Sequence, residues 1–310
     1  MPVTVVRDAC FGDHDPGPGH PESPARYRAV DAALTQAVNE GLRIESLDAR
    51  PATREELQRV HGRAYLEQLK TIDGGFHRLD GDTPTSPASV QAAYRAAGAT
   101  VELATGVAEG SCPPGIAVVR PPGHHALPDR AMGFCLLNNV AVATRALQAA
   151  GVERVAIYDW DVHHGNGTQA MFFDDPNVLY MSSHQFPFYP GTGAAHETGA
   201  GPGEGATVNV PLPAGTGDDD LVQASHQILL PRVRDFSPDI ILISAGFDPY
   251  VDDPLGAFNI TVSGFRTLAQ LWRDTAEDVC SGRIAAVLEG GYDLDGLAAC
   301  VRGLAEAWDT

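Results

Sequence analysis

The chain has 310 residues, with 21 Lys and Arg against 40 Asp and Glu, and a formal net charge of −19. This acidic balance argues against a nucleic-acid-binding protein, because contacts to the phosphate backbone need clustered basic side chains. An apolar content of 44% argues against intrinsic disorder and fits a globular protein. The excess of acid either keeps the protein soluble or attracts a cationic substrate, and composition alone does not separate these two interpretations.

No apolar run reaches the length of a signal peptide or of a membrane span. We therefore expect no membrane association and predict a cytoplasmic location. The five cysteines are odd in number and never form a C-x-x-C pair. This usage predicts neither a disulfide framework nor a thiolate zinc site.

Helix-like and strand-like segments alternate along the chain. The Ala-rich stretch 89–108 predicts a first helix, and further helices are predicted at 138–150, 221–235 and 267–280. Short runs rich in β-branched residues predict buried strands at 116–119, 155–158, 178–181, 240–243 and 284–288. Strands that alternate with helices pair in parallel, so the sequence predicts an α/β layer fold.

Polar residues with catalytic potential follow four of these predicted strands. The four segments are RPPGHH (120–125), DWDVHHGNG (159–167), AGFDP (245–249) and EGGY (289–292). In parallel sheets, ligands bind where loops leave the carboxyl ends of the strands. We therefore expect the His, Asp and Tyr side chains of these segments to meet in one crevice.

A metal site is the first prediction for this crevice. Asp159, Asp161 and His163 alternate along the chain, so an extended backbone would point them the same way. Asp161 and His163 could share a metal with Asp248, which suits a catalytic zinc that keeps room for water. Fe(II) or Mn²⁺ accept the same ligands. The alternative is a salt-bridged cluster without metal, in which the carboxylates would repel each other.

Proton transfer is the second prediction. An imidazole titrates near neutral pH, so His124 or His125 could take a proton from water and return it to a leaving amine. Asp159 and Asn166 are candidates to hold the two rings through their second nitrogens. Tyr292 follows two glycines and could stabilise an oxyanion, although it could also be an ordinary half-buried tyrosine.

Aromatic residues near these segments predict a narrow apolar channel. They are Phe134, Phe188 and Tyr189, the last two beside a Gly-rich loop. Their alternative role is to staple that loop to the core. The chain contains no G-x-x-x-x-G-K-[ST] motif, so nucleotide binding has little support.

Taken together, seven segments make the sequence recognisable. They are HDPGPGHPESPARY, RPPGHH, MGFCLLNN, DWDVHHGNGTQ, FYPGTG, AGFDP and LEGGY, between residues 14 and about 303. The chain resembles the histone deacetylase family of the arginase/deacetylase superfamily, and in particular class II-like enzymes, bacterial histone deacetylase-like amidohydrolases and acetylpolyamine amidohydrolases. The resemblance implies a single deacetylase domain over residues 1–310, with a central, mostly parallel eight-stranded sheet and helices on both faces.

The resemblance also implies two kinds of metal ion. One Zn²⁺ per chain would be held by Asp161, His163 and Asp248. A structural K⁺ is expected nearby. Its implied ligands are the side chains of Asp159 and Ser182 and main-chain oxygens of Asp161, His163 and Ser183.

Catalytic roles follow from the same resemblance. His125 is expected to act as general base and then as general acid. His124 would support it electrostatically, with Asp159 behind, and Asn166 would orient His125. Tyr292 would donate a hydrogen bond to the scissile carbonyl and its oxyanion.

The resemblance further implies a substrate tunnel. The Gly133 backbone would accept the substrate amide N–H, and Phe134 with Phe188 or Tyr189 would form the walls. Arg26 matches an arginine that lines an internal acetate pocket in the family. Leu255 matches a position where polyamine-selective relatives can carry an acidic residue.

These expectations lead to a zinc-dependent amidohydrolase that removes acetyl groups from acetylated amines. Leu255 favours a substrate with acetyl-lysine in a protein or peptide, or a broad specificity. The alternative substrates are acetylpolyamines and other small acetylated amines. A dimetal ureohydrolase is a rival that would need an additional carboxylate where this chain has Gly246. A non-catalytic sensor of acetylated compounds is the remaining alternative. An oligomer is compatible with all of these readings.

Overall fold

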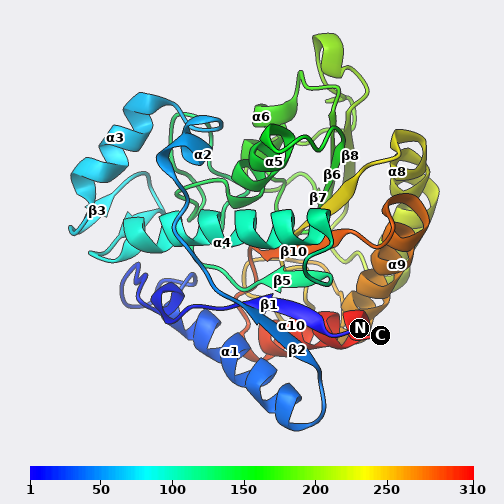
Figure 1. Ribbon diagram of the computed structural model, residues 1–310, viewed down its shortest axis with the longest axis horizontal. Helices are drawn as coiled ribbons and strands as arrows, with labels where there is room; N and C mark the ends of the chain where they lie inside the picture. Colours follow the sequence, from blue (N-terminus) through cyan, green and yellow to red (C-terminus); the bar gives the residue numbers. More distant parts are fainter.

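The computed structural model describes residues 1–310, and an eight-stranded sheet lies at its centre (Figure 1). The strand order is β2-β1-β5-β10-β9-β6-β7-β8, and every neighbouring pair is parallel. The strands are β1 (Val3–Val6), β2 (Ile44–Leu47), β5 (Gly115–Ala117), β6 (Val155–Asp159), β7 (Val178–Gln185), β8 (Thr207–Leu212), β9 (Ile240–Ala245) and β10 (Ile284–Leu288). A separate antiparallel hairpin joins β3 (His77–Arg78) to β4 (Pro84–Thr85).

The sequences of the central strands explain their position. β6, β9 and β10 are buried along their whole length, as expected for strands covered by helices on both faces. The edge strands differ. β2 is only partly buried. β8 contains Pro211, which has no N–H to donate to a neighbouring strand, and an edge strand tolerates this because one of its sides is unpaired.

Helices form a layer on each face of the sheet. α4 packs beside α5 on one face, and α10 packs against α1 and α9 on the other (Figure 1). The α-helices are α1 (Pro24–Asn39), α2 (Arg54–Gln58), α3 (Arg63–Ile72), α4 (Ser89–Glu109), α5 (Asn139–Ala149), α6 (Asn166–Phe172), α7 (Asp218–Ala224), α8 (Leu230–Phe236), α9 (Val262–Cys280) and α10 (Leu294–Trp308). Two 3₁₀ turns are η1 (Ala9–Gly12) and η2 (Gly201–Gly203), and η3 (Ser225–Leu229) is a π-helical turn. The predicted α/β fold class with a parallel sheet is confirmed.

Some predicted boundaries are wrong. The helix predicted over 221–235 is three segments, because the π turn η3 separates α7 from α8. Pro231 lies in the first turn of α8, where its missing N–H leaves a carbonyl of the preceding turn without its usual partner. The helix predicted from residue 267 begins instead at Val262, and its N-cap Thr261 accepts a hydrogen bond from the Gly264 N–H.

The topology brings five strand ends together. β5, β10, β9, β6 and β7 are consecutive in the sheet, and all are parallel, so the loops at their carboxyl ends lie along one edge.

None of the helices combines the length and the apolar character that crossing a membrane requires.

Candidate active site

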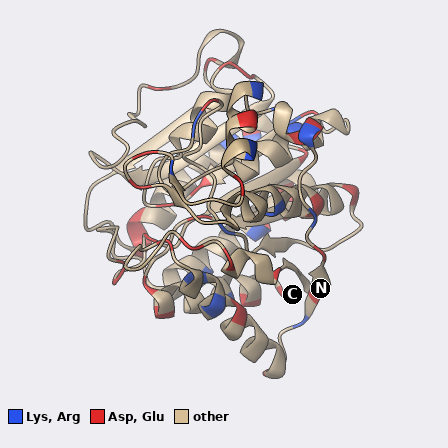
Figure 2. Cartoon of the chain, turned by 90° about the vertical axis from the view of Figure 1, so that its left-hand side faces the viewer, with Lys and Arg blue, Asp and Glu red and all other residues tan.

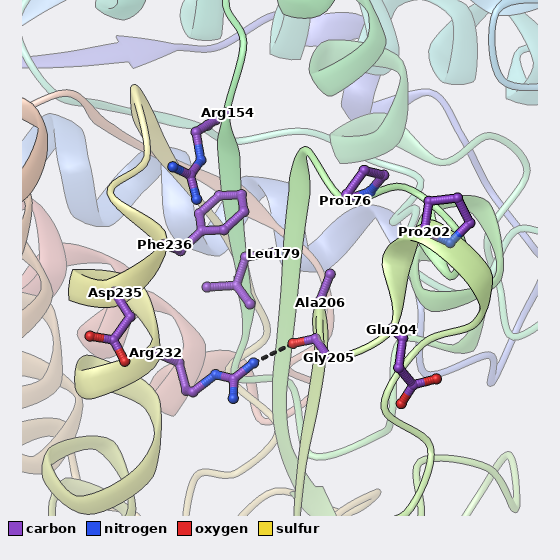
Figure 3. Close-up of a pocket in the computed structure, with 10 residues that line it drawn as sticks. All are labelled: Arg154, Pro176, Leu179, Pro202, Glu204, Gly205, Ala206, Arg232, Asp235 and Phe236. Carbon is purple, nitrogen blue, oxygen red and sulfur yellow. Dashed lines mark hydrogen bonds between the residues drawn. The ribbon is translucent and has the colours of Figure 1, made fainter.

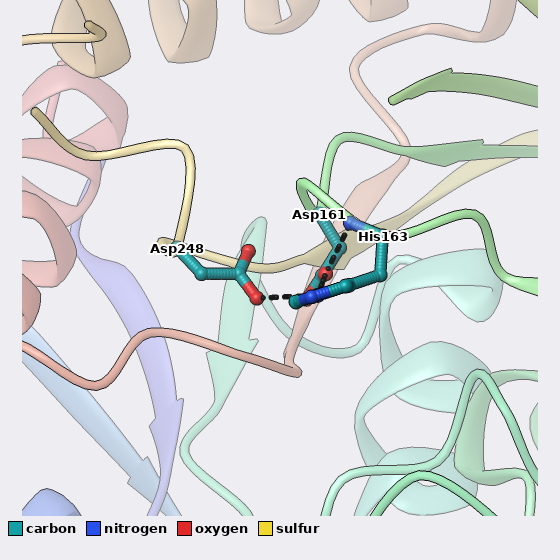
Figure 4. A group of neighbouring side chains, drawn as sticks. All are labelled: Asp161, His163 and Asp248. Carbon is teal, nitrogen blue, oxygen red and sulfur yellow. Dashed lines mark hydrogen bonds and ion pairs between the residues drawn. The ribbon is translucent and has the colours of Figure 1, made fainter. Parts of the chain in front are cut away.

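Three ligand-type side chains converge beyond the ends of β6 and β9 (Figure 4). Nδ1 of His163 lies 3.1 Å from Oδ1 of Asp161 and 3.1 Å from Oδ2 of Asp248. β6 ends at Asp159, so the strand alternation that we expected to extend through His163 stops earlier. A turn brings the side chains together instead, since the Asp161 carboxylate accepts a hydrogen bond of 2.9 Å from the His163 backbone N–H.

Backbone groups hold the two carboxylates in place. Asp161 accepts a hydrogen bond of 2.9 Å from the Gly290 N–H, and Asp248 accepts one of 2.9 Å from the Val162 N–H. A Cβ at Gly246 would lie 2.1 Å from Asp161 Oδ2, and one at Gly290 would lie 2.3 Å from Asp248 Oδ2. Both positions therefore require glycine, and no carboxylate fits at position 246.

The chemistry of this group suits a divalent cation. All three ligand atoms lie within 4.8 Å of one another, and both carboxylates are fully buried. Burial and the neighbouring Asp161 carboxylate raise the pKa of Asp248 to about 7, which shows how unfavourable two adjacent buried negative charges are here. Zinc binds nitrogen and oxygen ligands at about 2.0–2.2 Å, and donor atoms about 3 Å apart are compatible with that geometry.

The adjacent histidines lie in different electrostatic environments. Burial, reinforced by positive charge at His124 and His163, holds the pKa of His125 well below its usual value. Burial also opposes protonation of His124, but the Asp159 and Asp161 carboxylates outweigh it and raise the pKa of His124 well above its usual value. A proton is therefore favoured on His124 and disfavoured on His125.

Each ring is oriented by the partner that the sequence suggested. Nδ1 of His124 lies 3.0 Å from Oδ2 of Asp159. Nδ1 of His125 lies 2.8 Å from Oδ1 of Asn166, the first residue of α6. Because an amide oxygen only accepts, Nδ1 of His125 carries the proton and Nε2 keeps a free lone pair.

A buried glutamate, to which we assigned no role, supports this segment. The Glu289 carboxylate accepts hydrogen bonds from the N–H groups of Gly123, at 2.6 Å, and His124, at 3.1 Å. Glu289 lies in the EGGY segment after β10, so its position was known although its partners were not. It anchors the loop after β5 to the end of β10.

The Tyr292 loop is held from two sides. The Asp253 carboxylate accepts a hydrogen bond of 2.6 Å from the Tyr292 N–H. On the other side, the buried Arg26 guanidinium donates to the carbonyls of Glu289 and Gly291, both at 2.6 Å, and lies 4.9 Å from the Tyr292 ring centroid. Arg26 therefore lies behind Tyr292 and is not among the residues that line the cavity in front of it.

A cavity of about 230 Å³ leads to these groups. The Phe188 ring stacks on His163 with centroids 5.4 Å apart, and the Tyr189 ring meets His125 edge-on at 5.2 Å. The Phe134 ring lies 5.8 Å from that of Tyr292. The lining residues are Asp82, His125, Gly133, Phe134, His163, Phe188, Tyr189, Leu255 and Tyr292. The structure thus brings together the residues expected at the tunnel and adds Asp82, whereas Arg26, which was expected at an internal acetate pocket, lies behind Tyr292.

The two side chains proposed as potassium ligands lie on neighbouring strands, Asp159 at the end of β6 and Ser182 within β7. Asp159 pairs with Ser182 across the two strands. The Ser182 hydroxyl is 2.9 Å from Nδ1 of His184, and the Ser183 hydroxyl is 2.8 Å from the hydroxyl of Tyr158. Asp161 and His163, whose main-chain oxygens belong to the proposed potassium set, are also two of the three metal-ligand candidates, so the two proposed sites adjoin.

A second cavity, of about 340 Å³, lies elsewhere beside α8 and the β7–β8 edge (Figure 3). The Arg154 guanidinium stacks on Phe236 there, 4.3 Å from the ring centroid. Figure 3 shows the carboxylates of Glu204 and Asp235 turned away from the other lining side chains. The lining contains no histidine or cysteine.

Sequence comparison with known proteins gives the same family that the site residues resemble. Residues 20–308 match the family model described as histone deacetylase domain. The chain is 45% identical to histone deacetylase 15 of Arabidopsis thaliana over 285 residues, which cover 90% of this chain and 51% of that protein. It is 42% identical to the histone deacetylase-like amidohydrolase of Pseudomonas aeruginosa over 281 residues, covering 88% and 73%. A "probable deacetylase" of Archaeoglobus fulgidus is 41% identical over 299 residues, covering 96% and 83%.

Comparison with solved structures also finds a histone deacetylase domain. The crystal structure of the HDA15 HD domain superposes with a TM-score of 0.94 at 42% identity, covering 99% of this chain and 88% of that one. The chain spans about half the length of the Arabidopsis thaliana relative. The chain belongs to the histone deacetylase family, whose members include hydrolases named deacetylases and amidohydrolases.

Proposed function

We propose that this protein is a zinc-dependent deacetylase that hydrolyses the amide bond of acetylated amines. The observation that carries the proposal is one narrow cavity lined by a neutral His125, a ligand-type His163 and the Tyr292 phenol. The buried His125 and the exposed Tyr189, which is 38% accessible, indicate the inner and outer ends of that cavity. A linear acyl-amine chain fits such a shape.

The residues of the chain divide the reaction between them. Phe134 and Phe188 enclose the linear part of the substrate and exclude water, and the Gly133 carbonyl accepts the amide N–H. Nε2 of His125 takes a proton from the attacking water and later returns it to the leaving amine. The Tyr292 hydroxyl donates to the oxyanion that forms at the acetyl carbon. A zinc ion held by Asp161, His163 and Asp248 would supply Lewis acidity and lower the pKa of water at the site.

The substrate proposed first is acetyl-lysine in proteins or peptides, with broad specificity. The apolar Leu255 in the cavity lining supports this choice, because an acidic residue there would favour a second ammonium group. Acetylpolyamines and other small acetylated amines are the alternative, which the acidic Asp82 in the same lining supports. We also propose a structural K⁺ at Asp159 and Ser182, beside the zinc site.

Acetate release tests the proposal. The purified protein is assayed with an acetyl-lysine peptide and with N-acetylputrescine, before and after chelation, and its metal content is measured in parallel. We expect about one zinc per chain, loss of activity on chelation, recovery with zinc, and a higher kcat/KM for the peptide. His125→Ala, which retains all three ligands, should keep the metal but lose about 10²–10⁴-fold in kcat.

Different results would change different parts of the proposal. A His125→Ala protein that releases acetate at the wild-type rate would overturn the catalytic assignment. Two metal ions per chain would favour the ureohydrolase reading, despite the lack of room at Gly246. A kcat/KM that is higher for N-acetylputrescine would move the substrate to the small acetylated amines.

A further inference from the structure

The wall of the cavity contains an unusual backbone. Phe134 has a φ of +69°, in the left-handed region that bulky side chains rarely adopt. Gly133 before it has a φ of +57°, and a Cβ at Gly133 would lie 2.4 Å from the His125 ring. The Phe134 conformation therefore needs support from contacts outside its own segment.

The β3–β4 hairpin provides that support. The Thr83 hydroxyl, in the turn of the hairpin, accepts a hydrogen bond of 3.1 Å from the Phe134 backbone N–H. The same hydroxyl donates to the Asp82 carboxylate at 3.2 Å. Thr83 is only 1% exposed, so its hydroxyl meets little competition from water.

A histidine fixes the hairpin against the same wall. Nε2 of His20 donates to the Asp82 carbonyl at 3.1 Å, and the His20 ring meets Phe134 edge-on with centroids 4.8 Å apart. The cavity-lining Asp82, the Thr83 hydroxyl and the Phe134 N–H thus form one continuous chain of contacts. This chain connects the acidic residue of the lining to the aromatic wall.

We propose that Thr83 is a positioning residue that holds Phe134, and with it the Gly133 carbonyl, in the conformation that binds substrate. This inference rests on the proposed deacetylase function of the cavity. The hydroxyl is required because it accepts from Phe134 and donates to Asp82 at once. Substrate binding should therefore depend on Thr83, whereas the proton transfers at His125, which Thr83 does not contact, should not.

Two substitutions at position 83 isolate the hydroxyl. Thr83→Val keeps the shape and the branching but removes both hydrogen bonds, and Thr83→Ser keeps both bonds. For Thr83→Val we expect KM for an acetyl-lysine peptide to rise about tenfold with kcat within about twofold of wild type. Thr83→Ser should restore the wild-type KM.

Thr85 offers a matched control in the same hairpin. It is 3% exposed, and its hydroxyl accepts a hydrogen bond of 3.1 Å from the His77 N–H without any contact to Phe134. Thr85→Val should leave KM close to the wild-type value. Equal effects of Thr83→Val and Thr85→Val would overturn the proposal, as would a Thr83→Val protein with an unchanged KM or with a loss confined to kcat.

A structural measurement separates this inference from the proposed function. Crystal structures of the wild type, Thr83→Val and Thr83→Ser give the φ of Phe134 without any assay. We expect φ to remain left-handed in the wild type and in Thr83→Ser, and to change or become heterogeneous in Thr83→Val. An unaltered Phe134 in Thr83→Val overturns the positioning role. A wild type that cleaves no acetylated amine overturns the deacetylase function and with it the catalytic part of this inference.

Discussion

Burial lowers the pKa of both adjacent histidines, but the Asp159 and Asp161 carboxylates outweigh it at His124 and raise the pKa there. His125 faces the neutral amide of Asn166, and His124 faces the Asp159 carboxylate. The sequence predicted both partners, because they lie in the segment DWDVHHGNG (159–167). The sequence could not predict that the Glu289 carboxylate holds the backbone N–H of Gly123, just before the two histidines. That contact depends on the pairing of β10 with β5.

Tyr292 is the residue whose hydroxyl has the most specific proposed role. Tyr292→Phe should lower kcat about 10²–10³-fold, the usual effect of removing one oxyanion donor, with little change in KM. The ring should stay between Phe134 and the Arg26 guanidinium, so thermal stability should be unchanged. Steady-state kinetics and a thermal melt check both points. A rise in KM with an unchanged kcat would assign Tyr292 to substrate binding instead.

At the scale of elements, apolar patterning found β5, β6, β7, β9 and β10, which are buried along their whole length. It missed β1, β2 and β8, which are short or lie at an edge and lack a long apolar run. The topological rule about strand ends predicted that the candidate metal ligands, the two histidines and Tyr292 lie close together, and the structure places them so. It could not locate Asp82 and Thr83, because they belong to a hairpin outside the main sheet.

The junction between α1 and the loop after β5 depends on one buried glutamate. Glu22 pairs with Arg26 at 3.0 Å, with Arg120 at 2.5 Å and with His14 at 3.1 Å, and Glu22 and both arginines are fully buried. Glu22→Gln leaves two guanidiniums without a counter-charge. We expect a loss of about 3–5 kcal/mol in the free energy of unfolding at pH 7, measured by urea denaturation. The exposed Glu55→Gln, which breaks only the pair with Arg59, should cost less than about 1 kcal/mol.

The pH dependence of this effect has a definite sign. Although burial alone would raise it, the charges of Arg120 and His14 hold the pKa of Glu22 well below the usual value for a glutamate. A depressed carboxyl pKa adds stability above the unfolded value, and that stability is lost as the pH falls towards the folded value. The stability difference between wild type and Glu22→Gln should therefore shrink between pH 5 and about pH 3. A difference that grows with acid would contradict this reading.

At the scale of the whole molecule, the acidic excess is mostly a surface property. Asp159, Asp161 and Asp248 are buried and have local partners, but these few cannot account for a net charge of −19. Figure 2 shows Asp and Glu distributed over helices and loops, with Lys and Arg interspersed among them. Such a distribution gives a broad negative potential, to which Asp82 adds a charge at the proposed substrate cavity.

A broad potential and a single local charge predict different responses to salt. If the whole surface attracts cationic substrates, kcat/KM for N-acetylputrescine should fall several-fold between about 10 mM and 150 mM NaCl, as the Debye length shortens from about 30 Å to about 8 Å. KCl is held constant, so that the proposed potassium site is unaffected. A neutral acetylated amide of similar size should show no such fall. Asp82→Asn should lower kcat/KM for the cationic substrate, and most of the salt dependence should remain. If the salt dependence disappears in Asp82→Asn, the attraction comes from that one carboxylate.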